Sequence, residues 1–287
     1  MDFDLCYNIY ARLFLSRTKI AQNTRINQIE TERRNSMSAY YQREIDEIRE
    51  ILRTAQSVVF FGGAGVSTDS GIPDFRGSGG LYNQDDQNKY EESGAYLLST
   101  HCLQLEPKKF FNFYRNNMLY PNAQPNDTHK ALAQLEEEGV LTAVVTQNID
   151  GLHQMAGSKE VYELHGTVHE NYCNRCGRMY SLDFMLSSDG IPRCTECGGL
   201  VRPNVVLYGE GLDAEPYMAA EDAIAEADVL IVGGTSLTVE PAASLVSAFR
   251  GEHLIIINYT PTPYDGLAEY VIRDSLSDVF NAILEND

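Results

Sequence analysis

Four cysteines stand in two Cys-x-x-Cys pairs, Cys173 with Cys176 and Cys194 with Cys197, and 17 residues separate the pairs. This spacing is typical of zinc, because each pair presents two thiolates and the two pairs together complete a tetrahedron. Four sulfur ligands leave no open position on the metal, so we expect one structural zinc ion and no metal catalysis. Two disulfides are the alternative, but the first residues lack a secretion signal, and a reducing compartment does not preserve disulfides.

His165 lies just before this cysteine module and just after the polar stretch TQNIDGLH at 146–153. A neutral imidazole acts as a general base near pH 7, and Asn148 and Asp150 would give it polar neighbours. We therefore single out His165 as the candidate base. Four further histidines are interpreted as ordinary surface or core residues: His101, His129, His169 and His253.

A glycine-rich stretch, FGGAGVSTDSGIPDFRG at 60–76, begins like a nucleotide-binding turn. It departs from the dinucleotide fingerprint G-x-G-x-x-G, since Gly63 and Gly65 are present but Thr68 occupies the third position. Nucleotide binding therefore stays open at this point. If it occurs, a helix beginning at Ser67 or Thr68 would present backbone N–H groups and its dipole to a pyrophosphate.

These polar stretches all follow apolar runs, and helical patterns separate the runs. The polar or glycine-rich segments are GGAG at 62–65, TQNID at 146–150, GGTS at 233–236 and INY at 257–259. Helices are expected at 40–55, 129–139 and 221–227, and strands at 57–61, 141–148, 228–236 and 253–260. Such alternation predicts an α/β fold, a Rossmann-like parallel sheet covered on both faces. Ligands bind at the carboxyl ends of such strands, which is where these segments fall.

Composition and charge argue against nucleic-acid-binding and membrane proteins. The chain has 287 residues, of which 43% are hydrophobic, and carries a formal charge of -19. A strongly acidic chain disfavours direct nucleic-acid binding, and basic peptides are more natural partners. No run reaches the roughly 20 apolar residues that cross a bilayer. We expect a cytoplasmic protein with no membrane association.

The first 36 residues differ from the rest, since their basic residues outnumber the acidic ones. We expect 1–36 to be an N-terminal extension outside the folded core. Translation starting at Met37 would place it outside the native protein, and a genuine helical or disordered tail is the alternative.

The ordered motifs resemble a known family, the sirtuins. They are GAGVSTDSGIPDFRG, TQNIDGLH, ELHGT, the paired cysteines, RPNVVLYGE at 202–210, GGTSLTVEPAA at 233–243 and IIIN at 255–258. The resemblance covers about residues 44–285 and is greatest to compact bacterial sirtuins of the undifferentiated type. It implies NAD-dependent removal of acyl groups from lysine side chains of proteins or peptides, which yields nicotinamide and O-acetyl-ADP-ribose when the acyl group is acetyl.

The resemblance also implies roles for individual residues. His165 is similar to the family's base, and Asn148 and Asp150 to the residues that hold the nicotinamide carboxamide. The implied cofactor contacts are Gly63, Ala64, Gly65, Thr68, Asp74, Phe75, Arg76, Gln147, Asn148, Ile149, Asp150, Gly234, Thr235, Ser236 and Asn258. The implied substrate contacts, between which a peptide would insert as an extra strand, are Val206, Leu207, Tyr208, Gly209 and Val239.

The resemblance divides the chain into parts. The NAD-binding domain would comprise 37–76, 129–165 and 205–287, with a cofactor-loop and helical insertion at 77–128 and a zinc module at 166–204. Sirtuins that prefer succinyl or malonyl groups carry a Tyr-x-x-Arg pair, which is missing between Gly77 and Gln147, so acetyl is the expected group. Protein ADP-ribosyl transfer and a noncatalytic NAD-responsive binding protein stay open as alternatives.

Overall fold

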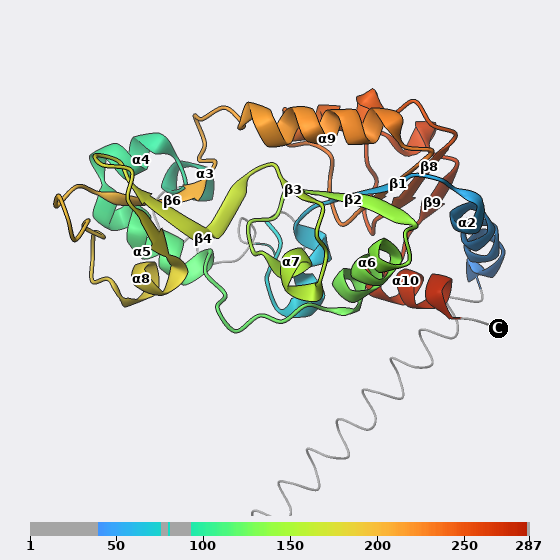
Figure 1. Cartoon of the computed structure of the whole chain (residues 1–287), viewed down its shortest axis with the longest axis horizontal. Helices are drawn as coiled ribbons and strands as arrows, with labels where there is room; N and C mark the ends of the chain where they lie inside the picture. The colour runs from blue at the N-terminus through green and yellow to red at the C-terminus, as the bar shows by residue number, and fades with distance from the viewer. Residues whose placement is uncertain (1–39, 76–79, 81–92, 286–287) are drawn as a thin grey trace, which may run out of the picture.

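A parallel sheet forms the larger part of the protein. The structure is a computed structural model that describes residues 40–75, 80 and 93–285. Within these residues, six parallel strands lie in the order β3-β2-β1-β7-β8-β9 (Figure 1). Their bounds are β1 Val58–Gly62, β2 Leu141–Thr146, β3 Val161–Glu163, β7 Val229–Gly233, β8 His253–Ile257 and β9 Tyr270–Ile272. This arrangement is the predicted Rossmann-like sheet.

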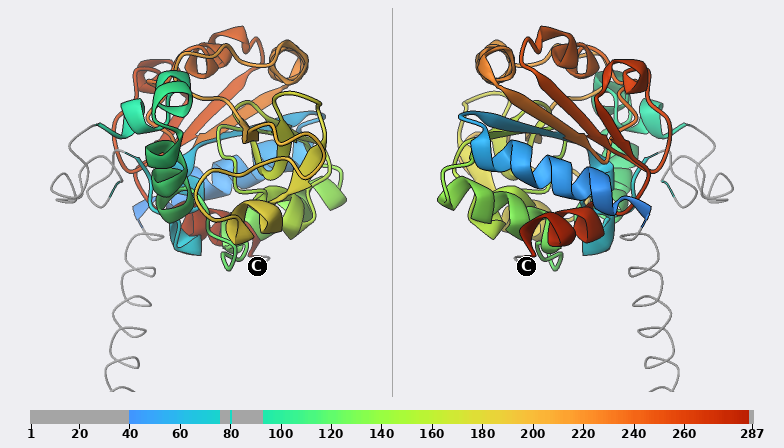
Figure 2. Two further views of the ribbon diagram at one scale, coloured as in Figure 1. Left: turned by 90° about the vertical axis from the view of Figure 1, so that its left-hand side faces the viewer. Right: turned by 90° about the vertical axis from the view of Figure 1, so that its right-hand side faces the viewer.

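Helices cover both faces of the sheet, because alternate strand residues point to opposite faces. On one face α2 (Gln42–Thr54), α6 (Asp127–Glu137) and α10 (Leu276–Leu284) pack against strand residues such as Val58 and Phe60. On the other face α9 (Ala214–Glu226) and the 3-10 segment Ala242–Ala248 pack against Val59 and Phe61. Figure 2 shows the three helices of the first face together beneath the sheet. Every residue of β1 is buried, as expected for a central parallel strand.

A second, smaller lobe adjoins one end of the sheet. Its antiparallel sheet has the order β5-β4-β6, formed by β4 (Gly166–Cys173), β5 (Met179–Ser181) and β6 (Val201–Val205). Its helices are α3 (Gly94–Leu97), α4 (Thr100–Leu105), α5 (Pro107–Asn117) and α8 (Leu182–Ser187). One apolar cluster, which includes Phe110, Phe111 and Val201, joins the helices to the small sheet. The helical segment and the cysteine-bearing sheet therefore share one core.

The predicted elements are present, and three of the four predicted strands end earlier than predicted, whereas β1 ends one residue later, at Gly62. β2, β7 and β8 stop two or three residues before the predicted limits, because their last polar residues belong to loops. Beyond these strands, β3 and β9 have three residues each and the sequence patterns did not indicate them. Short α7 (Leu152–Ala156) follows β2, and the one-turn 3-10 helix Asp265–Leu267 lies between β8 and β9.

The helix expected to begin at Ser67 or Thr68 is only a single 3-10 turn. Two one-turn 3-10 helices, Ala64–Val66 and Thr68–Ser70, occupy this stretch. The second ends at Gly71, which has a left-handed φ of 82°, and Pro73 lacks the N–H that a longer helix needs. A single turn has little summed dipole, so the argument for pyrophosphate binding by a helix dipole does not apply here.

Across the described ranges, no helix combines the length and the apolar composition that crossing a membrane requires.

Candidate active site

The loops that follow β1 and β7 pack directly on each other at the carboxyl edge of the sheet. The N–H of Gly65 donates to the carbonyl of Gly234 at 2.8 Å. A Cβ on Gly65 would lie 2.8 Å from the Gly234 Cα, and one on Gly63 would lie 2.8 Å from the Thr235 Cβ. The glycines are needed because two backbones meet here, which brings the two predicted cofactor loops together.

A network centred on Ser67 joins two further predicted residues. The Ser67 hydroxyl donates to Asp150 Oδ2 at 2.7 Å and accepts from Asn148 Nδ2 at 3.1 Å. The Asp150 carboxylate also accepts the N–H of Leu152 at the start of α7, at 3.0 Å. Ser67 is 1% exposed and Asn148 is 9% exposed, so these two members of the network are shielded from solvent. The sequence indicated Ser67 only as a possible helix start and not as a side chain that links Asn148 to Asp150.

His165 is held in one tautomer by the backbone. Its Nδ1 lies 2.9 Å from the carbonyl oxygen of Gln147. Because a carbonyl oxygen only accepts hydrogen bonds, Nδ1 carries the hydrogen and Nε2 keeps the lone pair of a base. Burial lowers the pKa of His165 below its usual range, although the bond to Gln147 partly raises it. The half-buried ring is therefore neutral and ready to accept a proton at Nε2 near pH 7.

The residues around β7 and β8 contact the same edge of the sheet. Gln147 Nε2 donates to Thr235 Oγ1 at 3.2 Å, which links the loop after β2 to the loop after β7. Ser236 shares a hydrogen bond of 2.8 Å with Thr238. Asn258 is 8% exposed, and its Nδ2 donates to the carbonyl of Thr260 at 2.8 Å. Since β7 and β8 are adjacent parallel strands, these side chains follow neighbouring strand ends.

The remaining predicted cofactor residues are less tightly placed. Thr68 is exposed, and its hydroxyl donates to the Gly65 carbonyl at 2.9 Å. Phe75 packs at the edge of the core of the smaller lobe, and Ile149 does the same while its carbonyl accepts the N–H of Val168 at 2.9 Å. Ala64 and Asp74 are partly buried. Arg76 and the extension at 1–36 lie outside the described residues.

The predicted substrate segment, Val206–Gly209, begins immediately after β6 and runs beside His165. The N–H of Val206 donates to the carbonyl of His165 at 2.9 Å. Tyr208 pairs with the segment before α4, donating to the Leu98 carbonyl at 3.0 Å and accepting the N–H of Thr100 at 3.1 Å. Val239 lies on the β7 side, where its carbonyl accepts the N–H of Ala243. The candidate base is thus tied by backbone to the candidate substrate segment.

The four cysteines converge as predicted. Among the residues that the structure describes, they are the group that could hold a metal ion, and their sulfur atoms all lie within 4.8 Å of one another. Cys173 and Cys197 Sγ are 3.5 Å apart, and Cys176 and Cys194 Sγ are 3.6 Å apart. A zinc ion bound at about 2.3 Å by four thiolates requires sulfur separations of about 3.8 Å, so the geometry fits one structural zinc ion.

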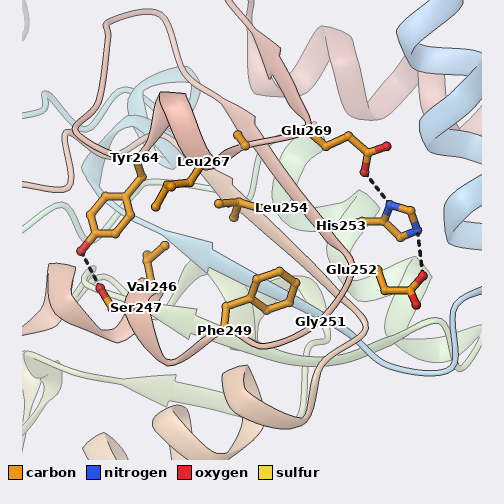
Figure 3. Close-up of a pocket in the computed structure, with 11 residues that line it drawn as sticks. Val246, Ser247, Phe249, Gly251, Glu252, His253, Leu254, Tyr264, Leu267 and Glu269 are labelled. Atoms are coloured by element: carbon orange, nitrogen blue, oxygen red, sulfur yellow. Dashed lines mark hydrogen bonds and ion pairs between the residues drawn. The ribbon is translucent and has the colours of Figure 1, made fainter.

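A separate groove of about 620 Å³ lies away from these residues. Val246, Phe249, Leu254 and Tyr264 line it, and His253 stands between Glu252 and Glu269 at one end (Figure 3). None of the predicted site residues lines it. His253 begins β8, so the groove approaches the edge of the sheet opposite to the candidate active site.

Comparison with known proteins supports one family. The profile described as the Sir2 family matches residues 63–241. A protein of Clostridium perfringens described as an NAD-dependent protein deacetylase is 51% identical over 243 residues, which cover 84% of this chain and 99% of that protein. A protein of Cutibacterium acnes with the same description is 50% identical over 238 residues, covering 83% of this chain and 96% of that protein.

Solved structures agree with this similarity. A structure described as a Sir2–p53 peptide–NAD+ complex has a TM-score of 0.72 and 38% identity, covering 83% of this chain and 96% of that chain. A second, described as Sir2 bound to acetylated peptide, has a TM-score of 0.72 and 36% identity, covering 84% of this chain and 97% of that chain.

Proposed function

Because this chain belongs to the Sir2 family and is an NAD-dependent protein deacetylase, we propose that His165 Nε2 is the base of its reaction. One observation carries this proposal: the Nδ1 hydrogen of His165 is donated to the Gln147 carbonyl, so Nε2 is the nitrogen that can accept a proton. With NAD bound, His165 Nε2 would accept the proton of a ribose hydroxyl. General-base assistance of this kind typically contributes a factor of about 10²–10⁴ in rate.

The Ser67 network would bind the nicotinamide end of NAD. Asn148 offers an amide and Asp150 a carboxylate, and the Ser67 hydroxyl orients both side chains. NAD supplies the ADP-ribosyl group that takes up the acetyl group, with nicotinamide as the leaving group. The overall reaction converts acetyl-lysine, NAD and water into lysine, nicotinamide and O-acetyl-ADP-ribose. The packed loops of Gly65 and Gly234, together with Thr235, Ser236 and Asn258, would hold the rest of the cofactor.

The zinc ion would have a structural role. Its four thiolate ligands fill the tetrahedron, and the cysteines hold together the small sheet whose strand β4 begins next to His165. The domain division predicted from the sequence is proposed on the same grounds, with the substrate entering between the zinc-bearing lobe and the parallel sheet. The thiolate site also suits a reducing compartment, so we place the protein in the cytoplasm.

Product analysis tests this function against its alternatives. The protein is incubated with an acetyl-lysine peptide and NAD labelled in the ADP-ribose, and the products are followed by mass spectrometry. We expect equal amounts of nicotinamide, deacetylated peptide and O-acetyl-ADP-ribose, and faster turnover of acetyl than of succinyl peptide. Label attached to a protein would indicate an ADP-ribosyltransferase, and unconsumed NAD would indicate a noncatalytic binding protein.

A further inference from the structure

The ion pair between Arg202 and Glu210 adjoins the proposed substrate segment and has no role in the chemistry described above. Arg202 on β6 forms a two-pronged contact with Glu210, in which Nη1 bonds Oε1 and Nη2 bonds Oε2. The side chains are 10% and 26% exposed, respectively. A largely buried arginine with a bidentate carboxylate partner is geometrically well defined, unlike a surface pair.

Arg202 is fully engaged within its strand. Nη2 also donates to the Val205 carbonyl at 2.9 Å, and Nε donates to the Pro203 carbonyl at 3.2 Å. Its guanidinium lies 5.7 Å from the ring centroid of Tyr172 on β4. The guanidinium is therefore held in one orientation against the small sheet, and its Nη1 and Nη2 atoms both donate to Glu210.

Glu210 uses the same carboxylate to close a turn. Its Oε2 accepts the N–H of Leu207 at 2.9 Å, and its own N–H donates to the Leu207 carbonyl at 2.9 Å. Burial by itself raises the pKa of Glu210, but the hydrogen bonds from Arg202 and Leu207 hold it below its usual range. The carboxylate is thus ionised and fixes the turn Leu207–Glu210 to the small sheet.

This turn contains most of the proposed substrate segment. Val206 is bonded to the His165 carbonyl, and Tyr208 to Leu98 and Thr100. Glu210 adds a third attachment, because its carboxylate joins Leu207 of the same segment to Arg202 of the small sheet. We propose that Arg202 and Glu210 are positioning residues for the acetyl-lysine substrate. They would hold the backbone of Val206–Gly209 in the position and register in which it can pair with the substrate backbone. This inference rests on the proposed function of the segment. Neither residue touches the reacting atoms.

The test separates substrate positioning from general stability. Glu210→Gln keeps an acceptor for Leu207 but leaves the buried Arg202 without a counter-charge. We expect the KM for an acetyl-lysine peptide to rise at least tenfold, with kcat at saturating peptide within threefold and NAD affinity without peptide within twofold of wild type. Asp228→Asn is the matched control, because Asp228 accepts the N–H groups of Gln56 and Ser57 before β1, at the opposite edge of the sheet.

A double variant identifies the origin of the effect. Arg202→Met with Glu210→Met removes both charges, so we expect its melting temperature to exceed that of Glu210→Gln, while its KM stays raised because Leu207 loses its acceptor. If Glu210→Gln does not fold, Arg202→Lys replaces it, and the same rise in KM is expected because a lysine cannot form the two-pronged contact.

Three results would overturn the inference: an unchanged peptide KM in Glu210→Gln, an equal loss of NAD affinity, or a normal KM in the double variant. A wild-type protein that releases no nicotinamide with acetyl peptide would instead refute the proposed function, so the two failures are distinguishable.

Discussion

Replacing Ser67 with alanine tests whether the hydroxyl between Asn148 and Asp150 serves catalysis. The change removes the 2.7 Å bond to the Asp150 carboxylate and the acceptor for Asn148 Nδ2. A hydrogen bond to a charged group contributes about 1.5–3 kcal/mol. Since about 1.36 kcal/mol corresponds to a tenfold change in rate, we expect kcat/KM for nicotinamide release to fall roughly 10- to 150-fold.

The assay measures nicotinamide release with acetyl peptide, alongside thermal unfolding. Ser70→Ala is the matched control, because Ser70 lies three residues further along and its hydroxyl accepts an amide hydrogen of Asn126 at 3.0 Å. We expect this control to stay within threefold of wild type. A folded Ser67→Ala variant with activity within threefold of wild type would refute the reasoning, because the network would then be structural.

Three further predictions concern stability. Burial lowers the pKa of His153 to about 3, so the unfolded chain binds a proton near pH 6.5 that the folded chain does not, and stability falls as the pH falls. When the pH is lowered from 7.5 to 5, the free energy of unfolding, measured with urea, should decrease in both proteins. The decrease should be about 2 kcal/mol smaller in His153→Phe than in wild type. An equal decrease would contradict this. Cys176→Ser should reduce bound zinc from one ion per chain to nearly none and lower the melting temperature, whereas retained zinc, measured by elemental analysis, would exclude this site. Gly166→Ala should lower the free energy of unfolding by at least about 3 kcal/mol, because its Cβ would lie 2.1 Å from the Asn204 carbonyl oxygen. Gly139 has a similar φ but lies in open space, so Gly139→Ala should lower it by about 1 kcal/mol. Similar losses for the two variants in urea unfolding would show that φ alone matters.

The sheet could be predicted because its central strands are buried on both faces. Val58–Gly62 and Val229–Gly233 are continuous apolar runs ending in glycine, and such runs carry a clear signal. β3 and β9 were missed since three residues, all of them partly exposed in β3 and two of them in β9, give neither a run nor an alternation. The cysteine site was predictable because its ligands are close in sequence and the spacing of the two Cys-x-x-Cys pairs alone identifies a metal site.

The contacts within the site depend on tertiary structure. Ser67 and Asp150 are 83 positions apart, and only the pairing of β1 with β2 brings them together. The signal that could have found Ser67 is its place two residues after Gly65, in the loop that follows a predicted strand. His129, interpreted as an ordinary residue, is fully buried beside His153, with ring centroids 4.7 Å apart and no partner for its Nε2 among the described residues. His169, given the same interpretation, lies 2.9 Å from the Asp150 carbonyl.

The pH dependence of catalysis follows from the same burial. The lowered pKa of His165 keeps Nε2 unprotonated further into the acidic range than an exposed histidine would be. The acid limb of kcat/KM should therefore have its midpoint below 6.5 and should be lost in variants without this imidazole.

The most direct test of the central claim is the turnover of His165→Ala, measured together with NAD affinity. We predict that turnover with acetyl peptide falls by a factor of about 10²–10⁴ while NAD binds within threefold of wild type, and that His101→Ala, a change at an exposed residue of α4, has neither effect. Undiminished turnover in His165→Ala would contradict the account, because the nitrogen left free by the Gln147 contact would then have no part in moving the proton.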